Sequence, residues 1–170
     1  MPRALLPWKT MIELDKADLA ILSILQEDCR APLDLIADQV GVSVITVQRR
    51  IKRLRDRGVI LRDVSILEPK QLGWKMTFLV LVELEKERTD MLDRFQKRLM
   101  NDPQVQQCYY ITGEADFAVI CLAKDMEDFE LLTHRLFFDD PNIRRFRTNV
   151  VMRRSKVGME VMIDEEINRS

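Results

Sequence analysis

The sequence contains little histidine and no paired cysteine motif. His134 is the single histidine, and Cys29, Cys108 and Cys121 lie far apart without a C-x-x-C spacing. One imidazole and three isolated thiols are too few for a His/Cys metal site, and an odd number of cysteines argues against a disulfide framework. We therefore expect no metal, no cofactor and a reducing, cytoplasmic environment.

Long apolar runs are also missing. No segment approaches the roughly 20 apolar residues that a membrane-spanning helix needs. Met1–Thr10 lacks the long apolar region of a signal peptide, and we interpret residues 1–13 as a short N-terminal extension. The chain supplies no convincing set of nucleophile, base and orienting group either. We therefore expect neither a membrane protein nor an enzyme.

Positive charge is concentrated in one stretch of the chain. The whole chain of 170 residues has a formal net charge of −1. Ser43–Arg62, by contrast, contains seven Lys/Arg and a single acid, Asp56, which gives this stretch a charge of +6. One strongly basic patch on a mildly acidic body is typical of local contact with phosphates.

Apolar residues at helical spacing predict three short helices in the first part of the chain. The expected helices cover Asp15–Asp28, Leu33–Val40 and Val44–Arg57. Gly41 ends the second helix, because glycine readily adopts the left-handed turn conformation, and Ser43 is a good N-cap for the third. Two helices joined by such a turn form a helix-turn-helix. With a β segment over Val59–Leu67, the pattern predicts a winged helix-turn-helix domain over 14–63.

The third predicted helix has an apolar side and a basic side. At about 100° per residue, the side expected to pack on the first two helices contains Val44, Val47, Ile51 and Leu54. A helix that enters the major groove needs this division. We therefore predict that the DNA contacts come from the other sides of this helix and its cap, at Ser43, Ile45, Thr46, Gln48, Arg49, Arg50, Lys52 and Arg53.

The position along this helix suggests a role for each contact. Ile45, Thr46 and Arg49, early in the helix, are best placed for base edges, where arginine can bridge the O6 and N7 of guanine. Lys52, Arg53 and Arg55 are expected to hold phosphates. A merely solvated basic helix is the alternative, but the charge run coincides with the second helix of a tight two-helix unit, which favours DNA.

The second half of the chain predicts an α+β fold. The expected strands cover Met76–Leu84, Val105–Ile111, Phe117–Ala123 and Ile143–Arg153, and the expected helices cover Thr89–Met100 and Met126–Phe138. This βαββαβ order is the ferredoxin-like arrangement. We place a linker at 64–75 and a second domain at 76–170, for which the family resemblance given below implies a role in effector sensing and oligomerisation.

A turn between two of these strands has the chemistry to hold an amino acid. Gly113 allows a tight turn in which backbone amides point together at a carboxylate, and Asp116 would face an ammonium group. Ordinary turn formation is the simpler explanation of this Gly-x-x-Asp sequence, because both residues are common in turns.

The sequence resembles the Lrp/AsnC family of feast/famine regulators from Leu14 to Gly158. LDKADLAILSILQEDCRAPLDLIADQVGVS and VQRRIKRLRDRGVI resemble its DNA-binding domain, and QQCYYITGEADFAVICLAKD and RRFRTNVVMRRSKVG resemble its effector-sensing domain. The resemblance implies a transcription regulator that binds a palindromic operator in double-stranded DNA. It also implies dimers that assemble to octamers, with a small amino-acid-like effector bound at an interface between dimers.

The same resemblance identifies the effector-binding residues. They are the Gly-x-x-Asp turn with its preceding residues and a threonine on the last strand: Ile111, Thr112, Gly113, Glu114, Ala115, Asp116 and Thr148. Family members often have Tyr or Phe where this chain has Ala115, and Ser-Pro-Thr-Pro-Cys where it has Ser43–Val47. The effector and the operator sequence therefore do not carry over from relatives.

Two other functions remain open on the sequence. Sirohaem decarboxylases are similar to this family in both domains, but they generally use histidines, and this chain has one. An architectural DNA-binding protein that ignores effectors is the second alternative.

Overall fold

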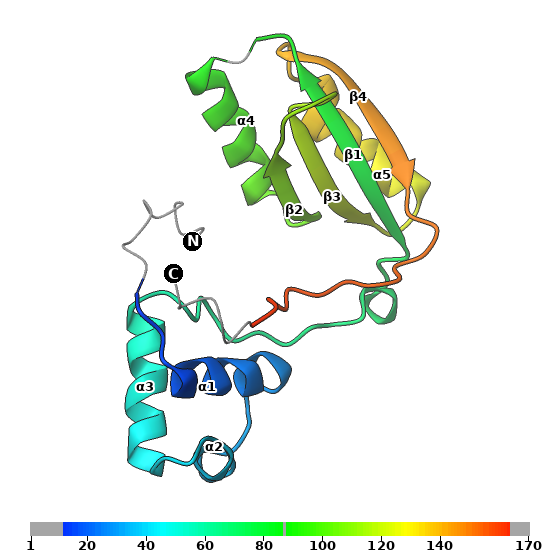
Figure 1. Ribbon diagram of the computed structural model, residues 1–170. Helices are drawn as coiled ribbons and strands as arrows, with labels where there is room; N and C mark the ends of the chain where they lie inside the picture. Colours follow the sequence, from blue (N-terminus) through cyan, green and yellow to red (C-terminus); the bar gives the residue numbers. More distant parts are fainter. Residues whose placement is uncertain (1–11, 87, 164–170) are drawn as a thin grey trace. The chain divides into compact units, whose positions relative to one another are not determined.

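The computed structural model describes residues 12–86 and 88–163, which divide into two compact units (Figure 1). Within the described residues, Ile12–Ile66 and Lys156–Ile163 form one unit, and Leu67–Ser155 forms the other. Most of the proposed N-terminal extension, 1–13, lies outside the described residues. Every helix that the structure describes is too short or too polar to cross a bilayer.

Three helices build the first unit: α1 (Lys16–Glu27), α2 (Leu33–Val40) and α3 (Val44–Asp56). Gly41 adopts the expected left-handed conformation, with a φ of 73°, and the Ser43 side chain accepts the backbone N–H of Thr46 at the start of α3. The core of the unit is formed by side chains that include Ile21, Ile36, Val47, Ile51 and Leu54. The predicted apolar side of α3 is thus confirmed, except that Val44 stays 42% exposed.

The β segment predicted over Val59–Leu67 is wrong. The structure assigns no strand to these residues, and Leu61 and Ile66 remain exposed. A strand needs a neighbour for its backbone hydrogen bonds, and no described segment pairs with this one. A short 3₁₀ helix, η1 (Pro69–Leu72), follows it.

The last described residues are hydrogen-bonded to the side chain of Gln26 in the first unit. The Nε2 of Gln26, near the end of α1, donates to the carbonyl of Val161 at 3.1 Å, and the Val161 N–H donates to Gln26 Oε1 at 3.1 Å. Residues 156–163 are therefore grouped with the helices of the first unit by contact, although we assigned them to the sensor domain from the sequence.

The second unit is a four-stranded antiparallel sheet with helices on one face, which confirms the ferredoxin-like βαββαβ prediction (Figure 1). The strands are β1 (Met76–Leu84), β2 (Val105–Tyr110), β3 (Phe117–Ala123) and β4 (Ile143–Val150), in the order β2-β3-β1-β4. The helices are α4 (Thr89–Asn101) and α5 (Met126–Thr133). β1 is central and β4 is an edge strand. β4 is shorter than predicted, because its partner β1 begins at Met76 and offers little backbone beyond Val150.

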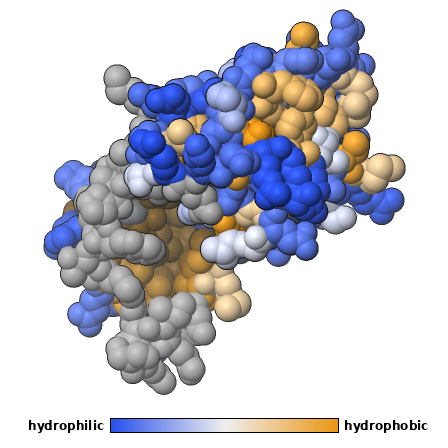
Figure 2. Space-filling view, turned by 90° about the horizontal axis from the view of Figure 1, so that it is seen from above, coloured by the Kyte–Doolittle hydropathy of each residue, from blue (hydrophilic) through white to orange (hydrophobic). Residues whose placement is uncertain are grey.

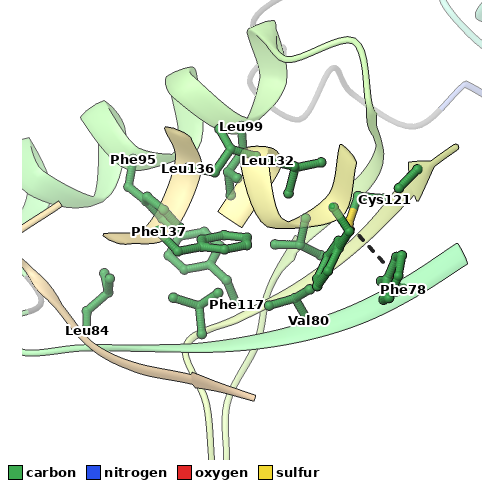
Figure 3. Close-up of a cluster of buried hydrophobic side chains, with 14 residues drawn as sticks. Phe78, Val80, Leu84, Phe95, Leu99, Phe117, Cys121, Leu132, Leu136 and Phe137 are labelled. Atoms are coloured by element: carbon green, nitrogen blue, oxygen red, sulfur yellow. Dashed lines mark hydrogen bonds between the residues drawn. The ribbon is translucent and has the colours of Figure 1, made fainter. Parts of the chain in front are cut away.

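Alternate residues of the strands form the core of this unit under the helices (Figure 3). Phe78 on β1 stacks on Phe129 of α5, with ring centroids 3.6 Å apart. Phe95 of α4 meets Phe117 of β3 edge to face. Cys121 is buried in the same cluster, and burial raises the pKa of its thiol to about 12, so this cysteine is a neutral packing residue at physiological pH.

The helix predicted over Met126–Phe138 changes its winding near its end. From His134 to Phe138 the chain forms a π-helical turn, η2, in which the Asp139 N–H donates to the carbonyl of His134 at 3.3 Å. Both Leu136 and Phe137 are only 1% exposed, whereas Phe138 is 61% exposed. The wider turn thus accommodates two neighbouring side chains in the core and leaves the third at the surface.

Candidate functional site

The outward side of α3 presents a largely uncovered basic surface. Ile45 is 78% exposed, and Gln48 and Arg49 are exposed beside it. The Lys52 side chain is 79% exposed and forms only a surface ion pair with Asp56, at 3.1 Å. Among the described residues, Arg49 has no ion-pair partner. Side chains on this surface can reach a large ligand without unfolding any part of the unit.

The first turn of α3 is held by its own cap. The hydroxyls of Ser43 and Thr46 lie 2.9 Å apart, and the Thr46 N–H donates to Ser43 Oγ at 3.3 Å. These two predicted DNA-contacting residues therefore engage each other in the unbound protein. The cap leaves the N-terminal end of α3 ordered and its following residues in fixed directions.

Two of the predicted DNA-contacting arginines are ion-paired inside the unit. Nη1 of Arg50 lies 2.7 Å from Asp15 and 2.8 Å from Asp18, and Nη2 of Arg53 also contacts Asp18. The Asp18 side chain is only 1% exposed, so its charge is compensated by these two guanidinium groups. Arg50 is 21% exposed and acts as a brace between α3 and α1, while Arg53 keeps 46% of its side chain exposed.

Asp15 and Asp18 also form the capping box of α1. Each carboxylate accepts the backbone N–H of the other residue, Asp15 at 2.9 Å and Asp18 at 3.2 Å. Burial alone would raise the pKa of Asp15, but the hydrogen bonds from Asp18 and Arg50 outweigh it and lower this pKa below its usual value. We assigned Asp18 no role from the sequence. The Asp-x-x-Asp spacing at a helix start was the available signal, because it matches the geometry of a capping box.

The turn between β2 and β3 is tight and partly exposed. Gly113 has a φ of 124°, which few other residues adopt, and the Ile111 N–H donates to the carbonyl of Asp116 at 2.8 Å. Thr112, Gly113 and Glu114 are exposed, whereas Ala115 is buried. The predicted effector turn therefore exists as a surface turn whose middle residues are open to solvent.

Asp116 is anchored to the end of the central strand. Its Oδ2 accepts the backbone N–H of Leu84 at 2.6 Å, and its own N–H donates to the carbonyl of Val82 at 2.9 Å. The carboxylate therefore has a structural contact in addition to the ligand contact that we expect from the sequence.

Thr148 and the turn 111–116 do not line the same cavity, although the neighbouring Arg147 contacts Glu114 of the turn at 3.3 Å. Thr148 pairs with Val80 across the β1–β4 ladder and lines a cavity of about 450 Å³ beside α5. No residue of the segment 111–116 lines that cavity. The structure thus brings the turn residues together, and no contact between Thr148 and the turn joins them within the chain that it describes.

The sheet face opposite the helices combines an apolar centre with a charged end. Leu79 and Leu81 of β1 and Ile120 of β3 alternate with core residues and are only partly covered. At one end, Glu83 Oε1 contacts Arg145 at 2.7 Å and Arg147 at 3.1 Å. These hydrogen bonds lower the pKa of Glu83 and keep its carboxylate ionised, and the hydrogen bond from Arg145 has the larger effect. Figure 2 shows apolar surface among the polar surface of the protein.

Comparison with known proteins identifies both units. Residues 14–60 match the family of winged helix-turn-helix DNA-binding domains, and residues 77–161 match the Lrp/AsnC ligand binding domain. The chain is 46% identical over 153 residues to an uncharacterised HTH-type transcriptional regulator, y4tD, of Sinorhizobium fredii, and the match covers 90% of each chain.

Solved structures agree with these matches. An AsnC family transcriptional regulator from Agrobacterium tumefaciens is 28% identical, with a TM-score of 0.82 over 88% of this chain and 97% of the other. A feast or famine regulatory protein from M. tuberculosis, complexed with L-methionine, is 25% identical, with a TM-score of 0.80 over 89% of this chain and 100% of the other. The chain therefore belongs to the Lrp/AsnC family of transcriptional regulators.

Proposed function

We propose that the protein is a sequence-specific DNA-binding regulator whose α3 enters the major groove, and whose sensor domain responds to an amino acid or a related small effector. The observation that carries the first half is the outward side of α3. Ile45, Gln48 and Arg49 are exposed on it, while Val47, Ile51 and Leu54 fix the helix from the other side.

The proposed DNA contacts follow from the chemistry of each side chain. Arg49 suits the O6 and N7 of guanine, Gln48 suits adenine, and Ile45 suits a thymine methyl group. Lys52 and the exposed part of Arg53 suit phosphates. Arg50 has a smaller share in this interface than we expected from the sequence, because its guanidinium group already binds Asp15 and Asp18.

The open sheet face supports the proposal of a dimer. Burying Leu79, Leu81 and Ile120 against the same face of a second chain removes apolar area from water and gives a two-fold symmetric pair. Such a pair would present two α3 helices about one DNA turn, or about 34 Å, apart, which matches a palindromic operator. Dimers would assemble further to octamers, as the family resemblance implies.

Selection of bound duplexes from a random DNA library tests the regulator proposal. We expect the full chain to enrich a palindrome whose half-sites are centred about 10 base pairs apart, because a two-fold dimer reads two equal half-sites. Broad protection without an enriched sequence would instead favour the architectural alternative and would contradict sequence-specific regulation.

The effector site that we propose combines the turn 111–116 of one chain with Thr148 of another. The turn amides would bind the carboxylate of an amino acid, and Asp116 would bind its ammonium group. Two observations support this site: Thr112, Gly113 and Glu114 are exposed, and the M. tuberculosis relative was solved with L-methionine. The family resemblance places this site at an interface between dimers, so we propose that a second protomer supplies Thr148.

Asp116→Asn is expected to remove most of the response to the effector. In a thermal-shift screen, an amino acid that binds only the folded wild-type protein raises its melting temperature. The substitution keeps an oxygen for the Leu84 N–H but removes the charge that faces the ammonium group. We expect about 10- to 150-fold weaker binding of the hit, since a hydrogen bond to a charged group contributes about 1.5–3 kcal/mol.

The matched control for this substitution is Asp93→Asn, at an exposed position on α4. It removes the same charge far from the turn in sequence and should leave the melting shift unchanged. Undiminished uptake of the hit by Asp116→Asn in calorimetry would exclude Asp116 as the ammonium partner.

A further inference from the structure

A second basic stretch of the chain lies in the second unit. Residues 144–154 contain five arginines and no acid, which gives this stretch a charge of +5. We did not single it out from the sequence. Because the whole chain has a net charge of −1 and residues 43–62 have +6, all other residues together carry −12. Positive charge is therefore gathered in two places on an otherwise acidic protein, and one of them contains the proposed DNA-binding helix.

Three of these five arginines are not compensated by an acid. Arg145 and Arg147 both contact Glu83, at 2.7 and 3.1 Å, and these ion pairs account for two of the five charges. The other three have no ion-pair partner among the residues that the structure describes, and we call them the unpaired arginines: Arg144, Arg153 and Arg154. Their charge is available to a partner outside the chain.

Arg144 occupies a break in the β1–β4 ladder. Glu83 of β1 pairs with Arg145, whereas the next residue, Leu84, pairs with Ile143. Arg144 is therefore passed over by the ladder, as the extra residue of a β-bulge is. Bulges are common at sheet edges, where they re-aim a side chain. Here the bulge lets Ile143 pack against the core and leaves Arg144 exposed.

The unpaired arginines lie toward the two ends of an edge strand (Figure 1). Among the described strands, β4 pairs only with β1. Arg144 is the second residue of β4, and Arg153 and Arg154 follow its last residue, Val150. From Arg144 to Val150 the strand extends about 20 Å, at about 3.3 Å per residue. This length matches about six phosphates along one strand of a DNA duplex, and a single small anion could not contact both ends.

We propose that the unpaired arginines bind the phosphate backbone of DNA that flanks the operator. The proposal rests on the proposed function, because α3 must first bind the protein to a duplex. Arginine suits this role, since its guanidinium group is always charged and binds a phosphate through two hydrogen bonds. Phosphate contacts carry no sequence information, so this surface would lengthen the bound DNA without changing the operator sequence. Charged side chains also keep edge strands from pairing with other chains, but either sign of charge would serve that purpose.

Salt-dependent binding of the full chain to two duplexes tests the proposal. The short duplex contains only the enriched palindrome, and the long duplex extends it by about three helical turns on each side. Each phosphate contact steepens the fall of log affinity with log salt by about 0.9, so three contacts make affinity rise about 40-fold more between about 200 and 50 mM salt. We expect the wild type to show this extra rise on the long duplex. The triple variant Arg144→Gln, Arg153→Gln and Arg154→Gln should lose it and should bind the short duplex like the wild type.

The matched control removes three positive charges from exposed positions before and on α4: Lys86→Gln, Arg94→Gln and Lys97→Gln. It should bind both duplexes like the wild type. Equal salt slopes of the wild type on the two duplexes, an unchanged long-duplex slope in the arginine variant, or an equal loss in the control would each overturn this proposal alone. A changed assembly mass of the arginine variant in light scattering, with its long-duplex slope intact, would mean that the arginines contact another copy of the chain, which also overturns it. If selection enriches no palindrome, both proposals fail.

Discussion

Arg49→Ala is expected to weaken operator binding by about 1–3 kcal/mol, which corresponds to a loss of about 5- to 150-fold in affinity. Arg49 is exposed on the outward side of α3 and has no ion-pair partner among the described residues, so the protein does not have to break a contact of its own to present it. A guanidinium group that bridges guanine O6 and N7 loses both hydrogen bonds on truncation. Mobility-shift titration at fixed salt, on the duplex enriched by selection, measures this effect.

Two further variants separate base reading from general charge. Lys52→Ala should weaken binding to all sequences alike and reduce the slope of log affinity against log salt by about one, because it removes one phosphate contact. Arg94→Ala removes the same charge from an exposed position on α4 and should change neither quantity. Wild-type operator affinity in Arg49→Ala would refute its role as a base contact.

The sequence predicted α3 and its faces well, but not the partners of its arginines. Helical periodicity gives the direction in which a side chain leaves its own helix, and on that basis Arg49 and Arg50 are both candidates for DNA. They differ because α1 brings Asp15 and Asp18 against Arg50 and leaves Arg49 uncovered. That difference depends on the packing of α1 against α3, which periodicity within a single helix does not contain.

The errors in secondary structure have a similar origin. Val59–Leu67 has the composition of a strand but no described neighbour to pair with, while Phe117–Ala123 has neighbours on both sides and forms the predicted strand β3. β propensity describes a fit to a pleated, half-buried surface, so it predicts a strand only where the fold supplies that surface. The π-helical turn after Thr133 likewise follows from packing Leu136 and Phe137 together in the core.

The predicted effector residues differ in how they could be identified from the sequence. The turn at Gly113 could be predicted from local chemistry, because glycine supplies the φ of 124° that the turn needs. Thr148 was assigned only by resemblance to the family, and its position opposite Val80 on the edge strand depends on sheet order and register. Local sequence patterns fix neither of these.

Asp18→Asn is expected to destabilise the DNA-binding unit by about 2–3 kcal/mol. Breaking a buried ion pair costs about 3–5 kcal/mol, and the cost is smaller here because solvent screens the partly exposed partners Arg50 and Arg53. The substitution keeps the shape of the side chain but leaves two guanidinium groups facing a neutral amide. In the full chain, hydrogen exchange of the α3 amides should become about 30- to 160-fold faster wherever exchange requires opening of this unit.

Asp56→Asn is the matched control, because it removes an aspartate from an ion pair in the same unit. The Asp56 and Lys52 side chains are 63% and 79% exposed, so we expect a change of at most about 0.5 kcal/mol and no measurable change in α3 exchange. Equal exchange rates of the α3 amides in the Asp18 and Asp56 variants would show that burial of Asp18 does not strengthen its ion pairs with Arg50 and Arg53. Faster exchange in Asp18→Asn alone would mean that two basic residues of α3 stabilise the helix on which Arg49 is presented. Loss of DNA binding in an Arg50 variant would then have to be separated from loss of the folded unit before it counted as a lost contact.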